Sequence, residues 1–380
     1  MHGTYISKKL IVATLFVVSF LGSPSLFAKE NPQYKNELLT KIENKSGSSL
    51  TELMDKHDVP GISIAVIKDR KLHWASGFGV KQQGKPDRVD TETMFSVGSI
   101  SKVGTAVTTL RLVDQGKLDL DADVNQYLKN WKAPTSFNGK PVKISLTRLL
   151  SHTAGLSVHG FADFQPGEKL PTTAQILRGK SPAKNGAVEL IIEPGTQYRY
   201  SGGGTTVVQM VLEDLLNQNF TTIAEQNLFK KLGMNRSSYV NPLPSGFENI
   251  AKAHSSWGNA RALPRGYEAM PEMAASGLWT TPTDLSKILL SLMGAYFGDE
   301  QAIISQRTAK KMMQPVAPSQ FGLGPRIKTD KIFQHGGAND SYKALFKVSL
   351  RTGNGYVVFT NGADGDELID ELELVMDEML

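Results

Sequence analysis

Strand-like segments occur near both ends of this chain, whereas its long middle favours helices and loops. Alternating apolar residues predict four strands, over residues 62–67, 71–77, 342–350 and 356–360. Lys68-Asp69-Arg70 separates the first two, and Gly353-Asn354-Gly355 lies between the last two, as is typical of β-hairpins. Two hairpins so far apart along the chain predict one antiparallel sheet that is assembled from both ends.

Helical patterns complete an α+β fold. Apolar residues recur at helical spacing over several stretches. The predicted helices cover about residues 31–57 with a break near 46–49, 99–115, 146–150, 205–216 and 368–379. The helices at the two ends of the chain would flank the sheet as an α/β sandwich.

The sequence predicts one domain over residues 29–380, built from two lobes. We expect an α/β lobe of about residues 35–115 and 270–380, with a mainly helical lobe of about residues 116–269 inserted into it. With 380 residues, 40% of them apolar, the chain is long enough for a large core. A cleft between two such lobes would be a natural ligand site.

Residues 1–28 read as a signal peptide. Lys8 and Lys9 precede an apolar run over residues 10–21, and small residues lead to a plausible cleavage site after Ala28. The run is too short to span a bilayer. We therefore expect a periplasmic or secreted protein without stable membrane insertion after cleavage; a retained N-terminal anchor is the alternative.

Composition excludes several kinds of chemistry. The chain has no cysteine, which rules out disulfides, a thiolate nucleophile and cysteine-ligated zinc. Its net charge of +5 is spread along the sequence, so no basic arm or aromatic-basic face indicates a nucleic-acid partner.

A serine and a lysine share one face of the helix predicted over residues 99–115. Lys102 follows Ser99 by one turn, on the stripe formed by Val103, Ala106 and Leu110. A buried amine tends to lose its charge and can then accept a proton from a neighbouring hydroxyl. The pair is therefore a candidate nucleophile and base, although Ser-x-x-Lys also occurs by chance in solvated first turns.

Other motif-like segments have simpler interpretations. Ser151-His152 fits a loop-fixing pair better than a catalytic dyad, because a lysine is already available as the base. Residues 155–159 miss the Gly-x-Ser-x-Gly pattern of α/β hydrolases. Residues 118–123 resemble a calcium loop but lack its glycine and its final glutamate, which indicates a solvated turn that caps a following helix.

Three separated segments together resemble a known family. Residues 99–102 (Ser-Ile-Ser-Lys), 198–202 (Tyr-Arg-Tyr-Ser-Gly) and 335–339 (His-Gly-Gly-Ala-Asn) have the order and spacing of the serine β-lactamase and penicillin-binding protein superfamily. The chain most resembles the class C β-lactamase-related branch, with its esterases, D-aminopeptidases and DD-carboxypeptidases. The resemblance covers roughly residues 40–380 and implies a β-lactamase/transpeptidase-like fold.

The resemblance implies a role for each matching residue. Ser99 would be the acylated nucleophile and Lys102 its activator. Tyr200 would be the phenol or phenolate that relays a proton to the leaving group. Tyr198 is a competitor for that role, and the alternative for Tyr200 is a packing role only. The backbone N–H groups of Ser99 and Ala338 would form the oxyanion hole. Substrate would contact His335, Gly337, Ala338 and Asn339, with no metal or organic cofactor.

Two departures from the family pattern bear on the substrate. Gly202 stands where these relatives have asparagine, and His335 stands where they have the lysine of Lys-Thr-Gly. His335 would orient Tyr200, or bind an anion when protonated, unless it is only structural. The implied substrates are small esters, D-amino acid peptides derived from peptidoglycan and, weakly if at all, β-lactams. A catalytically idle binder of cell-wall peptides or penicillin is the rival hypothesis.

Overall fold

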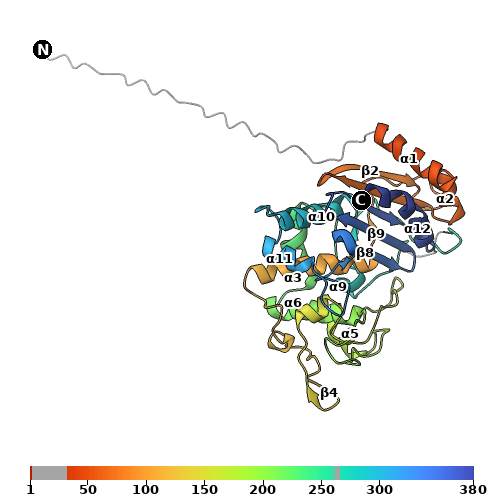
Figure 1. The fold of residues 1–380 in the computed structure, drawn as a ribbon. Helices are drawn as coiled ribbons and strands as arrows, with labels where there is room; N and C mark the ends of the chain where they lie inside the picture. Colours follow the sequence, from red (N-terminus) through yellow and green to blue (C-terminus); the bar gives the residue numbers. More distant parts are fainter. Residues whose placement is uncertain (2–31, 260, 262–265) are drawn as a thin grey trace.

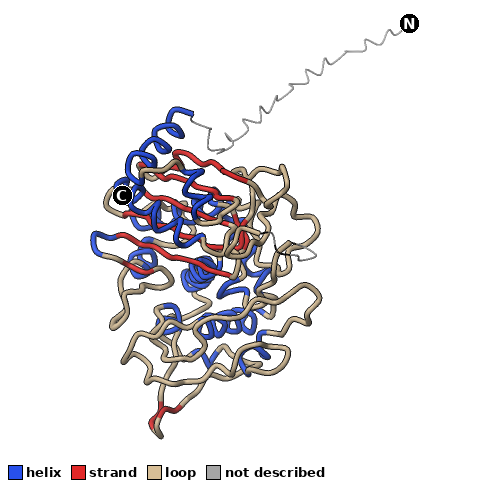
Figure 2. The backbone as a smooth tube through the Cα atoms, turned by 90° about the vertical axis from the view of Figure 1, so that its right-hand side faces the viewer, coloured by secondary structure: helices blue, strands red, loops and turns tan. Residues whose placement is uncertain are grey.

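One antiparallel sheet with helices on both faces organises the molecule (Figures 1 and 2). The computed structural model describes Met1, residues 32–259, Arg261 and residues 266–380. Apart from Met1, the predicted signal peptide lies outside the described residues. The α+β class predicted from the sequence is confirmed.

The six strands come from the two ends of the chain, and four of them are the strands of the two predicted hairpins. Their order is β2-β1-β10-β9-β8-β7, and the neighbouring strands β1 and β10 join the two ends, with Ile64 opposite Val358. All five neighbouring pairs are antiparallel. The strands are β1 (Gly61–Lys68), β2 (Lys71–Gly79), β7 (Arg326–Ile327), β8 (Ile332–Asn339), β9 (Tyr342–Ser349) and β10 (Gly355–Thr360).

Tight turns set the register of the two predicted hairpins. Asp69 and Arg70 connect β1 to β2 with φ values of 51° and 60°, the left-handed conformation that a two-residue hairpin loop requires. Gly353 adopts φ 76° between β9 and β10. The bounds of β8 could not be predicted from the sequence, because Gly336 and Gly337 weaken the strand pattern there.

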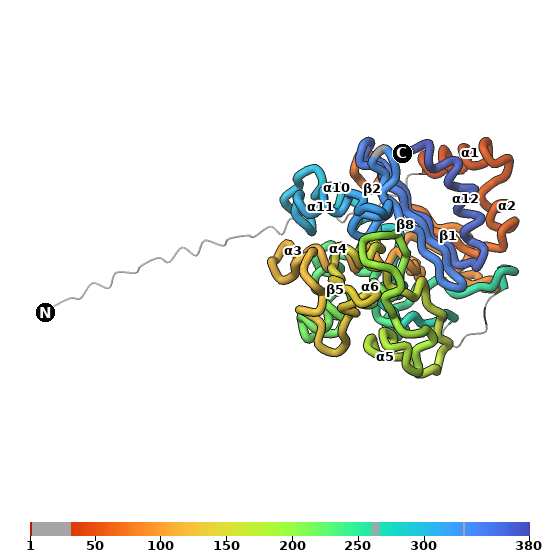
Figure 3. Tube along the Cα trace, turned by 60° about the horizontal axis from the view of Figure 1, so that its bottom comes forward, coloured from red at the N-terminus to blue at the C-terminus, as the bar shows by residue number. Residues whose placement is uncertain are grey.

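Three terminal helices cover the outer face of the sheet (Figure 3). They are α1 (Pro32–Ser46), α2 (Leu50–Lys56) and α12 (Gly365–Met376), followed by the short turn η5 (Asp377–Met379). Ser49 and Glu52 form a capping box that starts α2 after the predicted break. Side chains of Ile64, Val358 and Leu368 meet in a separate apolar core on this face.

The inner face packs against α3 (Ser101–Asp114) and α10 (Pro282–Phe297) in the larger core. Ala65 and Val357 point into it, one residue along from the outward-facing Ile64 and Val358, as strand alternation requires. Helix α10 was not predicted, although a Thr281 N-cap and Pro282 at its first position signal a helix start. The short helix α11 (Gln306–Met312) packs beside it.

Between α3 and α10 the chain forms short helices and long loops. The helix expected after residues 118–123 is only a 3₁₀ turn, and α6 begins at Gly202, three residues earlier than predicted, because Ser201 caps it by accepting the Gly204 N–H at 2.8 Å. The elements are η2 (Val124–Gln126), β4 (Ser136–Phe137), β5 (Lys140–Pro141), α4 (Leu146–Leu150), α5 (Thr173–Arg178), α6 (Gly202–Leu216), α7 (Phe220–Ala224), η3 (Glu225–Phe229), α8 (Lys230–Leu232) and α9 (Met273–Ser276). The lobe boundaries stay a prediction.

Among the helices of the described ranges, none combines the length and apolar character needed to cross a bilayer.

Candidate active site

Ser99 lies in a tight turn between the small sheet of β3 (Phe95–Ser96) with β6 (Trp279–Thr280) and the start of α3. The turn is the 3₁₀ segment η1 (Gly98–Ile100), so Ser99 precedes the α-helix instead of belonging to its first turn. Ser101 fixes this geometry, because its Oγ donates to the Gly98 carbonyl at 2.5 Å and accepts the Leu278 N–H at 2.8 Å.

Lys102 reaches back from the first turn of α3 to the nucleophile. Its Nζ lies 3.0 Å from Ser99 Oγ and donates to the Ala275 carbonyl at the end of α9, 2.8 Å away. The side chain is 3% exposed, and burial lowers the pKa of Lys102 from 10.5 to about 7. The structure therefore brings together the pair predicted from the sequence, with an amine that is substantially uncharged at neutral pH.

Tyr200 stands over this pair, immediately before the N-cap of α6. Its side chain hydrogen-bonds that of Ser99, and the ring centroid lies 4.9 Å from Lys102 Nζ. Burial raises the pKa of Tyr200 above its ordinary value, an effect that the hydrogen bond to Ser99 only partly offsets. Tyr200 is thus a neutral phenol, which corrects the phenolate alternative. Its competitor Tyr198 is exposed and stacks on Phe321 instead.

His152 positions Tyr200. The two rings lie 4.2 Å apart between centroids, and the Ser201 N–H donates to His152 Nδ1 at 3.2 Å. Burial holds the pKa of His152 well below its usual value, so the ring is neutral. Ser151 Oγ donates to the Thr147 carbonyl instead of contacting the histidine, which agrees with a loop-fixing pair.

Strand β8 passes directly over the nucleophile turn, and two glycines allow this close approach. A Cβ on Gly98, whose φ is +47°, would lie 2.6 Å from the Ala338 nitrogen. A Cβ on Gly337 would overlap the Val97 carbonyl oxygen and lie 3.1 Å from the Ser99 nitrogen. The backbone of Ala338 therefore lies beside that of Ser99, as a two-donor oxyanion hole requires.

Asn339, a predicted substrate contact, ties the end of β8 to the rest of the site. It is 8% exposed, and its Nδ2 donates to Ser96 Oγ at 2.6 Å and to the Ser276 carbonyl at 3.3 Å. Its amide N–H groups are thus engaged within the protein, although the residue also lines the cavity described below.

His335 is buried beside Tyr200 and is neutral. Its Nδ1 lies 2.6 Å from the Gly336 carbonyl oxygen, which only accepts, so Nδ1 carries the proton. Burial, followed by the nearby Lys102, lowers the pKa of His335 to about 4. The alternative in which His335 binds an anion requires the protonated ring, which this lowered pKa disfavours at neutral pH.

A cavity of about 860 Å³ connects these residues. Ser99, Tyr200 and His335 line it together with Gly337, Ala338 and Asn339, so the predicted site residues other than the buried Lys102 share one opening. Phe321 also lines the cavity and was missed, because it lies in the loop before β7 in a segment without a motif. The Ala275 carbonyl was missed because a backbone acceptor leaves no residue signature.

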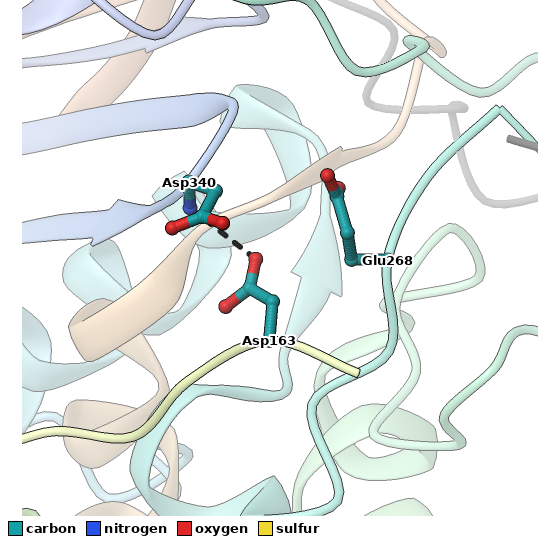
Figure 4. A group of neighbouring side chains, drawn as sticks. All are labelled: Asp163, Glu268 and Asp340. Atoms are coloured by element: carbon teal, nitrogen blue, oxygen red, sulfur yellow. Dashed lines mark hydrogen bonds between the residues drawn. The ribbon is translucent and has the colours of Figure 1, made fainter. Parts of the chain in front are cut away.

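Three carboxylates gather at another part of the site, and two of them, Asp163 and Asp340, line the cavity (Figure 4). Asp163, Glu268 and Asp340 offer oxygen atoms that lie within 4.8 Å of one another, a donor set that suits a hard divalent cation. The Asp340 backbone N–H donates to Asp163 at 3.3 Å, and Arg261 already donates to Glu268 at 3.0 Å. Burial, with repulsion from Asp340, raises the pKa of Asp163 to about 7.

Comparisons with known proteins place these observations in a family. The profile of the family described as Beta-lactamase matches residues 48–378. Protein flp of Staphylococcus aureus strain MRSA252 is 22% identical over 320 residues, which are 81% of this chain and 60% of that protein. An N-acetylmuramyl-L-alanine amidase of Bacillus subtilis strain 168 is 28% identical over 60% of this chain and 52% of its own length. The chain thus spans roughly half the length of these relatives.

Solved structures show the same fold at low identity. EstCE1, a hydrolase with promiscuous acyltransferase activity, superposes with a TM-score of 0.72 at 19% identity, over 90% of this chain and 99% of that one. An octameric penicillin-binding protein homologue from Pyrococcus abyssi superposes with a TM-score of 0.69 at 22% identity, over 89% of this chain and 77% of that one. The β-lactamase/transpeptidase-like fold predicted from the sequence is confirmed, and the chain belongs to the β-lactamase family of serine hydrolases.

Proposed function

We propose that this protein is an exported serine hydrolase that forms an acyl-enzyme on Ser99. Its substrates are esters, amides or β-lactams, with esterase or D-amino-acid peptidase activity foremost and β-lactamase activity weak or absent. One observation carries the proposal: a buried amine, Lys102 Nζ, lies 3.0 Å from Ser99 Oγ with its pKa lowered to about 7.

The first step is attack of Ser99 on the substrate carbonyl. Uncharged Lys102 takes the hydroxyl proton while the oxygen–carbon bond forms, and its bond to the Ala275 carbonyl keeps the amine aimed at Ser99. Negative charge develops on the carbonyl oxygen, where the N–H groups of Ser99 and Ala338 would stabilise it.

Collapse of the intermediate needs a proton for the leaving group. Tyr200 is a neutral phenol that contacts Ser99, so it can give its proton to the departing atom and regain one from Lys102. Water then attacks the acyl-enzyme, which releases the acid and restores Ser99. The sum is hydrolysis, with water as the only second reactant.

The relatives support this range of substrates without narrowing it. One neighbour in structure is a hydrolase with acyltransferase activity, one is a penicillin-binding protein homologue, and one relative in sequence bears the name of an amidase. Export rests on the predicted signal peptide over residues 1–28.

Labelling with a fluorophosphonate or a fluorescent penicillin tests the proposal. We expect one label per molecule with the fluorophosphonate, loss of that label in Ser99→Ala, and its retention in the control Ser48→Ala, which lies between α1 and α2. If no acylating probe labels the folded wild type, the idle peptide-binding or penicillin-binding alternative is correct instead.

A panel of three substrates then ranks the activities. Turnover of p-nitrophenyl acetate, D-alanyl-D-alanine peptides and nitrocefin is compared at equal enzyme concentration. The proposal expects the ester or the peptide to be hydrolysed faster than nitrocefin; faster nitrocefin turnover would assign a β-lactamase.

A further inference from the structure

Aromatic rings line the part of the cavity next to Tyr200. Phe321 is their centre: its ring lies 6.0 Å from that of Tyr200, 5.8 Å from that of His335 and 5.7 Å from that of Tyr198. Tyr198 stacks on Phe321 with an interplanar angle of only 11° and is 45% exposed, so part of its ring is available to a ligand. Phe321 itself is 8% exposed and held in place.

This aromatic wall has no fixed positive charge within it. His335 is neutral because its ring is 5% exposed, and burial, followed by the nearby Lys102, lowers the pKa of His335 to about 4 despite the bond from its Nδ1–H to the Gly336 carbonyl. Lys102 is directed at Ser99 and Ala275. Three other cations among the described residues line the cavity. Arg326 and Lys328 are exposed, so solvent screens their charges, although Arg326 lies close enough to Tyr198 to act on it electrostatically. Lys343 donates to the Asn339 and Asp340 carbonyls.

The wall lies on the side from which a leaving group departs. Tyr200 is the proposed proton donor to that group, and the rings of His335 and Phe321 both flank Tyr200. His335 also shares a face of β8 with Phe333 and Gly337, the face that meets the nucleophile turn. The leaving group would therefore lie against His335, Phe321 and Tyr198.

We propose that Tyr198, Phe321 and His335 form an uncharged aromatic subsite, which selects esters whose leaving group is planar or apolar and carries no carboxylate. The inference rests on the proposed Ser99 acyl-enzyme and narrows its substrate class. Ser99 Oγ bonds the acyl carbon, the ester C–O bond breaks, and the Ser99 proton passes through Lys102 and Tyr200 to the departing oxygen.

Desolvation explains the selection. A carboxylate in this subsite would lose its hydrating water and contact only the neutral His335 ring and aromatic faces, so its binding costs free energy. A flat apolar group instead stacks on these rings and binds favourably. Penicillins and D-alanyl-D-alanine peptides both carry a carboxylate next to the leaving nitrogen. They are therefore disfavoured relative to neutral aryl esters.

A pair of matched esters measures the selection directly. Methyl 3-acetoxybenzoate and 3-acetoxybenzoate differ only in whether the leaving phenol carries a methyl ester or a carboxylate, and both give the same acetyl-enzyme. The assay contains about 0.5 M NaCl, which screens the exposed charges of Arg326 and Lys328. Under these conditions we expect kcat/KM to be higher for the neutral ester by at least about tenfold. Equal rates, or preference for the carboxylate, would overturn the inference.

Substituting the histidine should change this ratio. His335→Lys places a cation in the subsite, so the preference should fall by at least about tenfold and labelling by fluorescent penicillin should rise. The matched control is His73→Lys on β2, which adds the same charge away from the cavity that Ser99 lines and should leave the ratio within about threefold of wild type. Equal effects of the two variants would contradict a local subsite.

The aromatic part is tested separately with phenyl acetate and trifluoroethyl acetate. Tyr198→Ala should reduce the preference for the phenyl ester by about fivefold, whereas Tyr198→Phe retains it, because the stacking ring remains. An unchanged ratio in Tyr198→Ala would overturn this part. Failure of the proposed function looks different, since no ester would be hydrolysed and Ser99 would not be labelled.

Discussion

Lys102 combines two properties that oppose each other. The amine must be buried to lose its charge near neutral pH, yet a buried amine destabilises the fold. The decrease in the pKa of Lys102 from 10.5 to about 7 corresponds to on the order of 4 kcal/mol of stability, at about 1.4 kcal/mol per pKa unit. Reactivity at this residue is thus obtained at the expense of the free energy of unfolding.

Replacing this lysine should abolish activity and stabilise the protein. We expect Lys102→Met to raise the free energy of unfolding by about 1 to 3 kcal/mol at pH 7. This gain is smaller than the whole cost of burying the amine, because the hydrogen bond to the Ala275 carbonyl is lost. Between about pH 7 and 10.5 the unfolded chain binds more protons than the folded one. The free energy of unfolding of the wild type therefore increases as the pH rises through this range, and the difference in stability between Lys102→Met and the wild type becomes smaller. Urea unfolding at several pH values measures this.

Lys347 provides the matched control, because it is a buried lysine whose charge is stabilised by carboxylates. It is 4% exposed and pairs with Glu373 at 2.6 Å and Asp377 at 2.8 Å, which raise the pKa of Lys347 despite its burial. Lys347→Met should therefore destabilise the protein at neutral pH, because it leaves two carboxylates without their partner. A Lys102→Met variant that is also less stable would contradict the account.

Tyr200→Phe tests the proton donor. We expect kcat for ethyl acetate to fall by about 10² to 10⁴, and kcat for p-nitrophenyl acetate to fall much less, because p-nitrophenolate leaves without a proton. Tyr198→Phe removes a hydroxyl from the exposed, stacked ring and should leave the ratio of the two rates unchanged. Equal losses on both esters in Tyr200→Phe would rule out leaving-group protonation.

Among the elements, β8 decides the geometry of the site because it is packed against the turn η1. A side chain at Gly337 would overlap the Val97 carbonyl, whereas the nearest atom to a Cβ at Gly336 is the Ala344 carbonyl oxygen, 3.8 Å away. We expect Gly337→Ala to reduce kcat/KM by about 100-fold through displacement of Ala338. Gly336→Ala should stay close to wild type. Steady-state kinetics and circular dichroism distinguish this loss from unfolding.

Several element boundaries followed local signals in the sequence, although the N-cap signal of α10 was missed. The hairpin turns at Asp69 and Gly353 require left-handed residues, and Ser49 starts α2 by capping it, so these features were predictable. The bounds of β8 could not be predicted because its two adjacent glycines allow the close contact with η1. This is a requirement of the tertiary structure, and strand propensity does not reflect it.

The described residues form two cores, one on each face of the sheet. Leu368 of α12 is fully buried in the outer core, on the opposite side of the sheet from Ser99. Leu368→Ala should lower the free energy of unfolding by about 2 to 5 kcal/mol while kcat/KM of the folded fraction stays near wild type. Urea denaturation with parallel kinetics tests this. A similar loss of kcat/KM would show that the outer core shapes the site.

The site draws on segments from all over the chain, and this limits what the sequence could predict. Ser99, Lys102, Tyr200 and the residues of β8 lie in motifs with fixed chemical requirements, so they were identifiable. Phe321 belongs to a loop whose place in the cavity depends on the complete fold. The neutral state of His335 depends in the same way on burial, which a sequence does not show.

The pH dependence of Ser99 labelling shows whether the uncharged amine of Lys102 activates the nucleophile. Intact-mass spectrometry would follow the rate at which a fluorophosphonate modifies the wild type from about pH 5 to 9, with Ser99→Ala as the blank. Because attack requires the uncharged amine of Lys102, the account predicts a rate that rises with pH and has its midpoint near the pKa of about 7. A rate that is flat over this range, or a label on another residue, would contradict it.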